Sequence, residues 1–224
     1  PWVRLVALVN HRLTQDFCVQ VYPKVARIVA VCEQDRELTR VACDSTPVDV
    51  IPNGVDCDYF SPRRPARPEP VLLFTGTSDE RNMQALRYFV REVYPLVRQE
   101  VHDVRFVVAG NLRKAAQAEF VGIPGVSCTG SLPDLRPIYN QSAVFVSPFR
   151  EAYGSKLKVS EALAMGICVV STPAGARGMP VKDEQSVLIG RDGPHMAQQI
   201  VRALQDPALA RRIGRAGRAV ALEH

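Results

Sequence analysis

The sequence lacks any spacing of cysteines or histidines that would bind a metal ion. It has six cysteines and four histidines among 224 residues, and no two cysteines form a C-x-x-C pair. A zinc site is therefore not expected, and we expect no metal. Cys128 and Cys168 fall in strand-like runs and are interpreted as small core residues. The default for such cysteines is a reduced, cytoplasmic compartment.

Long apolar runs are also missing. No run approaches the length of a membrane span, and the start shows no basic segment followed by an apolar one, so neither a span nor a signal peptide is predicted. The net charge of +5 suits anionic ligands or a weakly anionic membrane surface. The arginines of residues 211–218 have no aromatic residues between them, so they are interpreted as a solvated helix face and nucleic acid is not an expected partner.

Two common nucleotide-binding motifs are absent as well. No G-x-G-x-x-G follows a predicted strand, and no acid stands about 20 residues beyond one, which disfavours a dinucleotide-dependent dehydrogenase. No G-x-x-x-x-G-K-[ST] occurs, which disfavours phosphoryl transfer through a P-loop.

What the sequence does contain is a regular alternation of strands and helices. Continuous apolar runs predict strands, and stretches with helical periodicity separate them. Continuous rather than alternating apolar strands indicate a parallel sheet covered on both faces, so the predicted fold class is α/β, Rossmann-like, with helices on both faces. The predicted strands are 27–31, 48–51, 71–76, 104–110, 125–130, 143–148, 167–172 and 186–190; the main predicted helices are 3–22, 82–100, 135–141 and 155–166.

A stiff connector interrupts this alternation. Five of the 17 prolines fall within Pro52–Pro70, a stretch that begins inside the rigid segment IPNGVD at 51–56. Proline and an Asn-Gly turn fix the direction of the backbone, so we place a domain boundary here. The predicted division is 1–48, 49–70 and 71–224.

Small residues recur where the predicted strands end. Parallel sheets bind ligands beyond the carboxyl ends of their strands, and a glycine there lets a ligand approach the backbone. The examples are Gly76, Gly110, Gly130 and Thr172. Any single glycine is explained as well by a tight turn, but four strand ends together favour a nucleotide.

The window PFREAYGSKLKVSEALAMG at 148–166 carries the most chemistry. Gly154 and Ser155 are predicted at a helix start, Lys156 and Lys158 lie nearby, and Glu161 follows within the helix. A helix start of this kind, with a lysine nearby, binds a diphosphate well, and the Glu161 carboxylate could accept hydrogen bonds from ribose hydroxyls. The open alternative is a capped amphipathic helix in which Glu161 pairs with Lys158 on the surface.

Several of these segments together resemble one enzyme family. IPNGVD followed by YFSP, LFTG at 73–76, VVAG at 107–110, EALAMG at 161–166 and VVST at 169–172 are similar to segments of the family-four (group 1) glycosyltransferases. The resemblance covers roughly residues 20–220. It implies a GT-B fold of two facing Rossmann-like domains, with residues 1–48 the tail of the acceptor domain, 49–70 the linker and 71–224 the donor-binding domain.

The resemblance also implies roles for individual residues. Glu161 matches the second glutamate of the family's E-x7-E motif, which holds the donor ribose, and Tyr153 stands in place of the first. Thr77 and Asn82 stand where many relatives carry an arginine and a lysine for the donor diphosphate. The window matches a subgroup pattern, P-x-R-x-G-x-G-T-R-L-K, in which Lys156 would supply that charge. The implied donor-binding residues are Gly76, Arg81, Gly130, Leu132, Gly154, Ser155, Lys156, Leu157 and Glu161; no catalytic residue is assigned.

In function, the resemblance implies a retaining, metal-independent transfer of a sugar from a UDP- or GDP-linked donor to a glycan or lipid-linked acceptor in bacterial polysaccharide synthesis. The donor is a co-substrate, and no cofactor is expected. Parts of the enzyme beyond both ends of this sequence would complete it, and peripheral membrane contact would come through the first domain. Two alternatives stay open: a module that binds a nucleotide or a protein without catalysis, and a sugar-nucleotide epimerase, for which no pair of acids is found.

Overall fold

The computed structural model describes residues 2–63, 69–151 and 154–224, with side chains from residue 12 onward. Its contacts divide the chain into two compact units. Of the described residues, the first unit comprises 2–53, 154 and 155, and the second comprises 54–63, 69–151 and 156–224. The predicted boundaries at residues 48 and 70 stay predictions, and part of the proline-rich connector lies outside the described residues.

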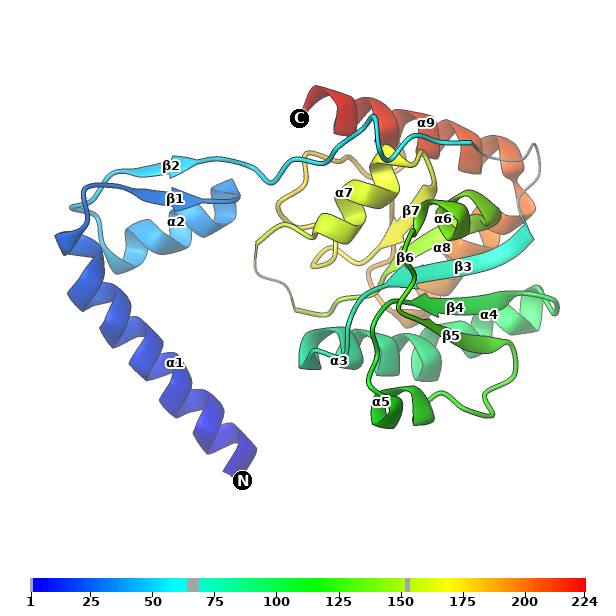
Figure 1. Ribbon diagram of the computed structural model, residues 1–224, viewed down its shortest axis with the longest axis horizontal. Helices are drawn as coiled ribbons and strands as arrows, with labels where there is room; N and C mark the ends of the chain where they lie inside the picture. The colour runs from blue at the N-terminus through cyan, green and yellow to red at the C-terminus, as the bar shows by residue number, and fades with distance from the viewer. Residues whose placement is uncertain (1, 64–68, 152–153) are drawn as a thin grey trace. The chain divides into compact units, whose positions relative to one another are not determined.

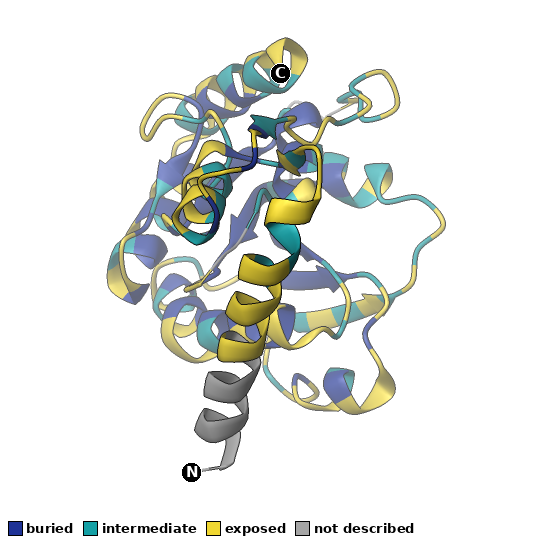
Figure 2. Cartoon of the chain, turned by 90° about the vertical axis from the view of Figure 1, so that its left-hand side faces the viewer, coloured by how far each residue is buried: buried dark blue, intermediate teal, exposed yellow. Residues whose placement is uncertain are grey.

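The first unit is small. It begins with helix α1 (Trp2–Val21) and the short 3₁₀ turn η1 (Tyr22–Lys24), followed by β1 (Ile28–Ala30), α2 (Glu33–Ala42) and β2 (Val48–Val50). β1 and β2 pair in parallel, with Ile28 opposite Val48. Figure 2 shows the part of α1 from Arg12 onward largely in yellow, and its apolar side chains Leu13 and Phe17 are both 60% exposed.

The second unit is a six-stranded parallel sheet. In chain order its strands are β3 (Glu69–Thr75), β4 (Arg105–Ala109), β5 (Val126–Gly130), β6 (Ser142–Ser147), β7 (Cys168–Ser171) and β8 (Leu188–Ile189). In space the order is β5-β4-β3-β6-β7-β8, with β3 and β6 side by side at the centre (Figure 1). This arrangement confirms the predicted parallel, Rossmann-like fold class.

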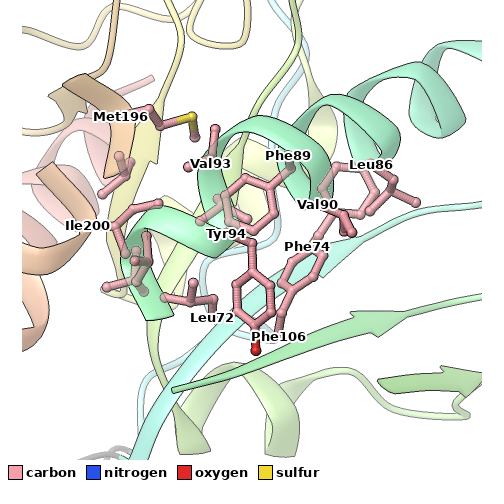
Figure 3. Packing of buried hydrophobic residues seen from close by; sticks show 14 of the residues in the cluster. Leu72, Phe74, Leu86, Phe89, Val90, Val93, Tyr94, Phe106, Met196 and Ile200 are labelled. Carbon is pink, nitrogen blue, oxygen red and sulfur yellow. The ribbon is translucent and has the colours of Figure 1, made fainter. Parts of the chain in front are cut away.

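Helices cover both faces of this sheet. They are α3 (Glu80–Tyr88), α4 (Tyr94–Glu100), α5 (Lys114–Ala118), α6 (Arg136–Gln141), α7 (Leu157–Ala164), α8 (Gly193–Gln205) and α9 (Pro207–Glu223). Successive side chains of β3 point to opposite faces. Leu72 and Phe74 belong to the cluster that α3, α4 and α8 cover (Figure 3), and Val71 and Leu73 belong to the cluster under α6 and α7.

The long helix predicted over 82–100 is present but divided. A π-helical segment, η2 (Phe89–Val93), joins α3 to α4, and the Tyr94 N–H donates to the carbonyl of Phe89. Pro95 follows at once and has no N–H to continue the regular ladder. Phe89, Val93 and Tyr94 are fully buried all the same, so the division leaves the apolar face of the helix intact.

Two further predictions were imprecise at their boundaries. The helix expected from residue 155 begins at Leu157, because Gly154 has a positive φ of 63° and Lys156 has an extended backbone. The strand expected over 186–190 has only two residues, Leu188 and Ile189. The cysteine interpretation was correct for Cys168, which is buried, whereas Cys128 is half-buried and packs against the core.

Candidate functional site

The order of the strands determines where a ligand can bind. From β3 the chain moves to one side, through β4 and β5, and then crosses back to β6 and continues to β8 on the other side. The loops after β3 and β6 therefore leave the sheet in opposite directions. In open α/β sheets the ligand binds at this switch point, beyond the carboxyl ends of the two strands. The residues after Thr75 and Ser147 are thus the candidate site.

The loop after β3 is held by a compact set of polar contacts. Asp79 caps α3 by accepting a hydrogen bond from the Asn82 N–H at 3.0 Å. The Asn82 side-chain NH₂ donates to the Thr77 carbonyl at 3.0 Å and also to the Asp79 carboxylate. Both contacts orient the Asn82 amide, and its oxygen is left to accept from another group.

That other group is the ammonium of Lys158. Its Nζ lies 2.6 Å from Asn82 Oδ1 and 4.4 Å from the centre of the Phe74 ring, with Phe149 at 5.2 Å. Burial lowers the pKa of Lys158 to about 8, although the charge of Asp79 opposes this. A lysine with this pKa is still mostly protonated at pH 7, so a half-buried positive charge lies at the switch point.

Gly76 leaves the space that this charge occupies. A Cβ at position 76 would lie 2.8 Å from both Lys158 Nζ and Asn82 Nδ2. Carbon atoms in folded proteins do not approach nitrogen so closely without displacement. The sequence placed Gly76 at the donor site because it ends a strand, and the structure adds a steric reason for a glycine there.

Glu161 lies one turn after Lys158 on α7. It is half-buried, and its carboxylate accepts a hydrogen bond from the hydroxyl of Tyr139 at 3.1 Å. Tyr139 is fully buried, and its hydroxyl also lies 3.2 Å from Thr75 Oγ1. Burial raises the pKa of Glu161, while the Tyr139 hydroxyl and the charge of Lys158 act in the opposite direction. No ion pair between Glu161 and Lys158 is found among the described residues, although each charge acts on the pKa of the other group, so the surface-pair alternative stays open.

The other predicted donor residues are distributed more widely. Arg81 is exposed, with its Nε 4.0 Å from Asp79 Oδ1, and Leu157 is 55% exposed. Lys156 is the N-cap residue of α7, and its Nζ lies 5.5 Å from the centre of the Phe149 ring. Gly130 ends β5 with a positive φ of 73°, where its carbonyl accepts from the Gly110 N–H at 3.0 Å. Leu132, two residues further on, packs against the core under α6 and α7.

Gly154 and Ser155 group with the first unit. Ser155 Oγ accepts a hydrogen bond from Asn53 Nδ2 at 2.9 Å. Tyr153, the position of the missing glutamate, lies outside the described residues. The donor-binding roles of Gly154 and Ser155 therefore stay predictions.

The sequence did not indicate that Asp79 and Tyr139 belong to the site. It named Asn82, but not as the residue that accepts a hydrogen bond from Lys158. It named Lys158 but assigned the diphosphate charge to Lys156. A signal was available, because Lys158 and Glu161 are three positions apart and therefore share one face of a helix.

Among the described residues, no cluster of three or more histidine, cysteine, aspartate or glutamate side chains could hold a metal ion. No helix of the described residues is long and apolar enough to cross a membrane.

Comparison with known proteins gives a consistent result. A Klebsiella pneumoniae protein described as an uncharacterized 44.6 kDa protein in the cps region is 27% identical over 128 residues, which cover 54% of this chain and 33% of that protein. A glycosyltransferase from Rickettsia africae has the same fold, with a TM-score of 0.72 at 16% identity, over 93% of this chain and 62% of its own. The Anabaena protein HepE, solved with UDP and glucose, aligns with a TM-score of 0.74 at 13% identity over the same shares.

The chain thus spans a third of its Klebsiella relative and 62% of the two solved structures. The family assignment comes from the sequence itself. Residues 69–206, which include β3 to β8 and the whole switch point, match the family described as glycosyl transferases group 1. The chain belongs to the group 1 glycosyltransferase family.

Proposed function

We propose that this chain is the donor-binding part of a retaining, family-four glycosyltransferase, with the C-terminal domain of a GT-B enzyme in residues 71–224. It would bind a nucleotide-diphosphate sugar, linked to UDP or GDP, and the sugar would be transferred to a glycan or lipid-linked acceptor. The observation that carries the proposal is the ammonium of Lys158 at the switch point, 2.6 Å from Asn82 Oδ1. This cation lies where an α/β sheet binds phosphates.

The proposed reaction breaks the bond between the anomeric carbon and the diphosphate oxygen. The acceptor oxygen forms the new bond on the same face of the sugar, and the hydroxyl proton leaves with the diphosphate. Negative charge therefore grows on the departing diphosphate. A fixed cation in a half-buried position stabilises that charge more than an exposed one, and this is the role we assign to Lys158. Lys156 and Arg81 are the secondary candidates.

Asn82 and Lys158 together explain how the site can lack the usual lysine. Asn82 stands where many relatives carry that residue, and here its amide oxygen accepts a hydrogen bond from Lys158. The positive charge thus comes from α7 instead of α3. Glu161 would accept hydrogen bonds from the ribose hydroxyls. The Tyr139 hydroxyl donates only to its Oε2 atom, so the carboxylate can still accept further hydrogen bonds. Backbone groups near Gly130 and Leu132 would contact the base.

A second candidate is a module that holds a nucleotide without transferring sugar. Tyr153 replaces the first glutamate of the family motif, and Thr77 replaces the diphosphate arginine. Both candidates require nucleotide binding at the same site, so binding alone does not separate them. Turnover of a nucleotide sugar by the whole enzyme does.

Calorimetric titration with UDP, GDP and their glucose and mannose conjugates tests the site directly. We expect saturable binding to one base series and at least a tenfold loss of affinity for Glu161→Ala. Glu223→Ala, an exposed glutamate at the end of α9, is the control and should bind as the parent does. Equal affinity of the Glu161→Ala variant would remove Glu161 from the donor site.

A further inference from the structure

A hollow lies beyond the carboxyl ends of β6, β7 and β8 in the second unit. Its volume is about 380 Å³, within the range of small-molecule sites. Phe149 and Arg150 line it from the loop after β6, and Thr172 lines it from the loop after β7. Arg191 and Asp192 line it after β8, and Tyr88 and Glu92 line it from the end of α3 and from η2.

The walls of this hollow are firmly positioned. The Thr172 hydroxyl donates to the Phe149 carbonyl and accepts from the Gly175 N–H at 3.0 Å, which ties the two loops together. Asp192 caps α8 through one carboxylate oxygen, 2.8 Å from the His195 N–H. Such contacts preorganise the hollow and reduce the entropy lost when a ligand binds.

Charges of both signs line the hollow in equal number. Arg150 and Arg191 are the cations, and Glu92 and Asp192 are the carboxylates. All four residues are exposed, and no ion pair involves any of them within the described residues. The two carboxylates would repel an anionic ligand, and the two guanidinium groups would repel a metal ion. The balance of charges therefore favours neither kind of ligand.

An aromatic side chain forms a further part of the wall. The Arg150 guanidinium lies 5.5 Å from the centre of the Tyr88 ring. Burial raises the pKa of the Tyr88 phenol, and the charges of Glu92 and Asp192 raise it further while Arg150 opposes them. The phenol therefore stays protonated at neutral pH, which adds a neutral donor and acceptor to the charged ones.

We propose that this hollow binds an uncharged glycosyl unit. Sugar hydroxyls donate to carboxylates and accept from guanidinium groups, so a neutral polyol satisfies both kinds of group at once. The Tyr88 ring adds an apolar surface against which the C–H groups of a pyranose ring can pack. The proposal rests on the proposed function for its class of ligand, and it adds a subsite whose residues are separate from Lys158 and Glu161.

The test is an NMR titration of the ¹⁵N-labelled chain. The probes are methyl α-glucoside, methyl α-galactoside and N-acetylglucosamine, with inorganic phosphate for comparison. We expect a neutral sugar to shift the amide signals of Thr172, Ala174 and Gly193 saturably, with roughly millimolar affinity, and phosphate to leave them unchanged. Arg191→Ala and Glu92→Gln should each weaken the sugar about tenfold. Arg211→Ala and Glu100→Gln, both at exposed positions on other surfaces, should not.

Comparison of UDP with UDP-glucose identifies the source of the sugar. If the donor sugar fills the hollow, UDP-glucose shifts these amides, UDP does not, and Arg191→Ala weakens UDP-glucose alone. If an acceptor unit fills it, free sugar still binds when UDP-glucose is saturating. The amide of Gly76 reports nucleotide binding in the same samples, so loss of one signal is distinguishable from loss of the other. Absence of saturable shifts up to about 50 mM of every neutral sugar, or unchanged affinity in both variants, would overturn the proposal.

Discussion

Lys158 Nζ lies 2.6 Å from Asn82 Oδ1, although 76 residues separate the two in sequence. Each residue is at the start of a helix that follows one of the two central strands, Asn82 on α3 after β3 and Lys158 on α7 after β6. The contact therefore bridges the two loops that diverge at the switch point. It places a cation between them, with the ring of Phe74 beneath it.

The first prediction concerns the charge of Lys158. Lys158→Met removes the ammonium and retains an apolar stem over Phe74 and Phe149. We expect UDP to bind at least tenfold more weakly, because a half-buried phosphate contact is lost. The folded state should lose little stability, since a partly desolvated charge is removed with it. Calorimetry and urea denaturation measure the two effects.

Lys156→Met is the matched control, because it removes the same charge two residues earlier. We expect a smaller, few-fold loss of UDP affinity. If Lys156→Met has the larger effect, the diphosphate charge comes from Lys156, as the sequence pattern indicates.

The second prediction concerns pH. The pKa of Lys158 in the free protein is about 8, and Asp79, Glu161, Lys156 and Arg81 are the charges that act on it. Below this pH the ammonium is present and binding of an anion is fully supported. Above it, binding must first protonate the amine, so UDP affinity should fall about fivefold between pH 8 and 9 and approach tenfold per pH unit at higher pH. Calorimetry at several pH values measures this slope.

Lys158→Arg separates this effect from other titrations. A guanidinium stays charged throughout the range, so its UDP affinity should be nearly constant from pH 7 to 9. An equal fall in both proteins would assign the pH dependence to another group.

Much of the fold was predictable because its signals are local. Apolar runs such as 71–76 and 143–148 must be buried away from water. Because they alternate with amphipathic helices, few folds other than a parallel sheet covered by helices can bury them. The boundaries were less predictable. The start of α7 depends on the positive φ of Gly154, and the π-helical segment depends on Pro95, and neither is visible in hydrophobic periodicity.

The site was less predictable than the fold, because its contacts join distant residues. Lys156 and Lys158 have the same chemistry, and in the sequence only the spacing of Lys158 from Glu161 distinguishes them. The choice depends on which side chain reaches Asn82, and that depends on the packing of α7 beside β3 and β6. Tyr139 lies in the short segment RPIYNQ, which is mostly polar, so its complete burial and its contact with Glu161 were not visible in the pattern.

The third prediction compares two glycines at neighbouring strand ends. Gly76→Ala would place a Cβ 2.8 Å from the ends of two side chains, Asn82 and Lys158, which can move away. We expect UDP affinity to fall about tenfold with a small loss of stability. Gly110 has a φ of 130°, and a Cβ there would collide with the Gly76 backbone, which cannot move away.

Gly110→Ala should therefore lower the free energy of unfolding by more than about 2 kcal/mol. Urea denaturation and UDP titration of both variants measure the contrast. If Gly76→Ala binds UDP as tightly as the parent, the position of the Lys158 ammonium does not matter for binding.

The last prediction concerns the hydroxyl behind Glu161. Tyr139→Phe removes the donor 3.1 Å from the Glu161 carboxylate and leaves Thr75 Oγ1 without that partner. Both groups are buried or half-buried, so we expect the free energy of unfolding to fall by about 1–3 kcal/mol. The carboxylate also loses the contact that orients it, so UDP should bind several-fold more weakly.

Tyr94→Phe is the matched control, because Tyr94 is equally buried and its hydroxyl donates to the Val104 carbonyl at 3.0 Å, outside the site. Denaturation should show a loss of stability in both variants, and calorimetry should show weaker UDP binding only for Tyr139→Phe. If the two variants bind UDP equally well, Tyr139 has a structural role alone, and the orientation of Glu161 does not depend on it.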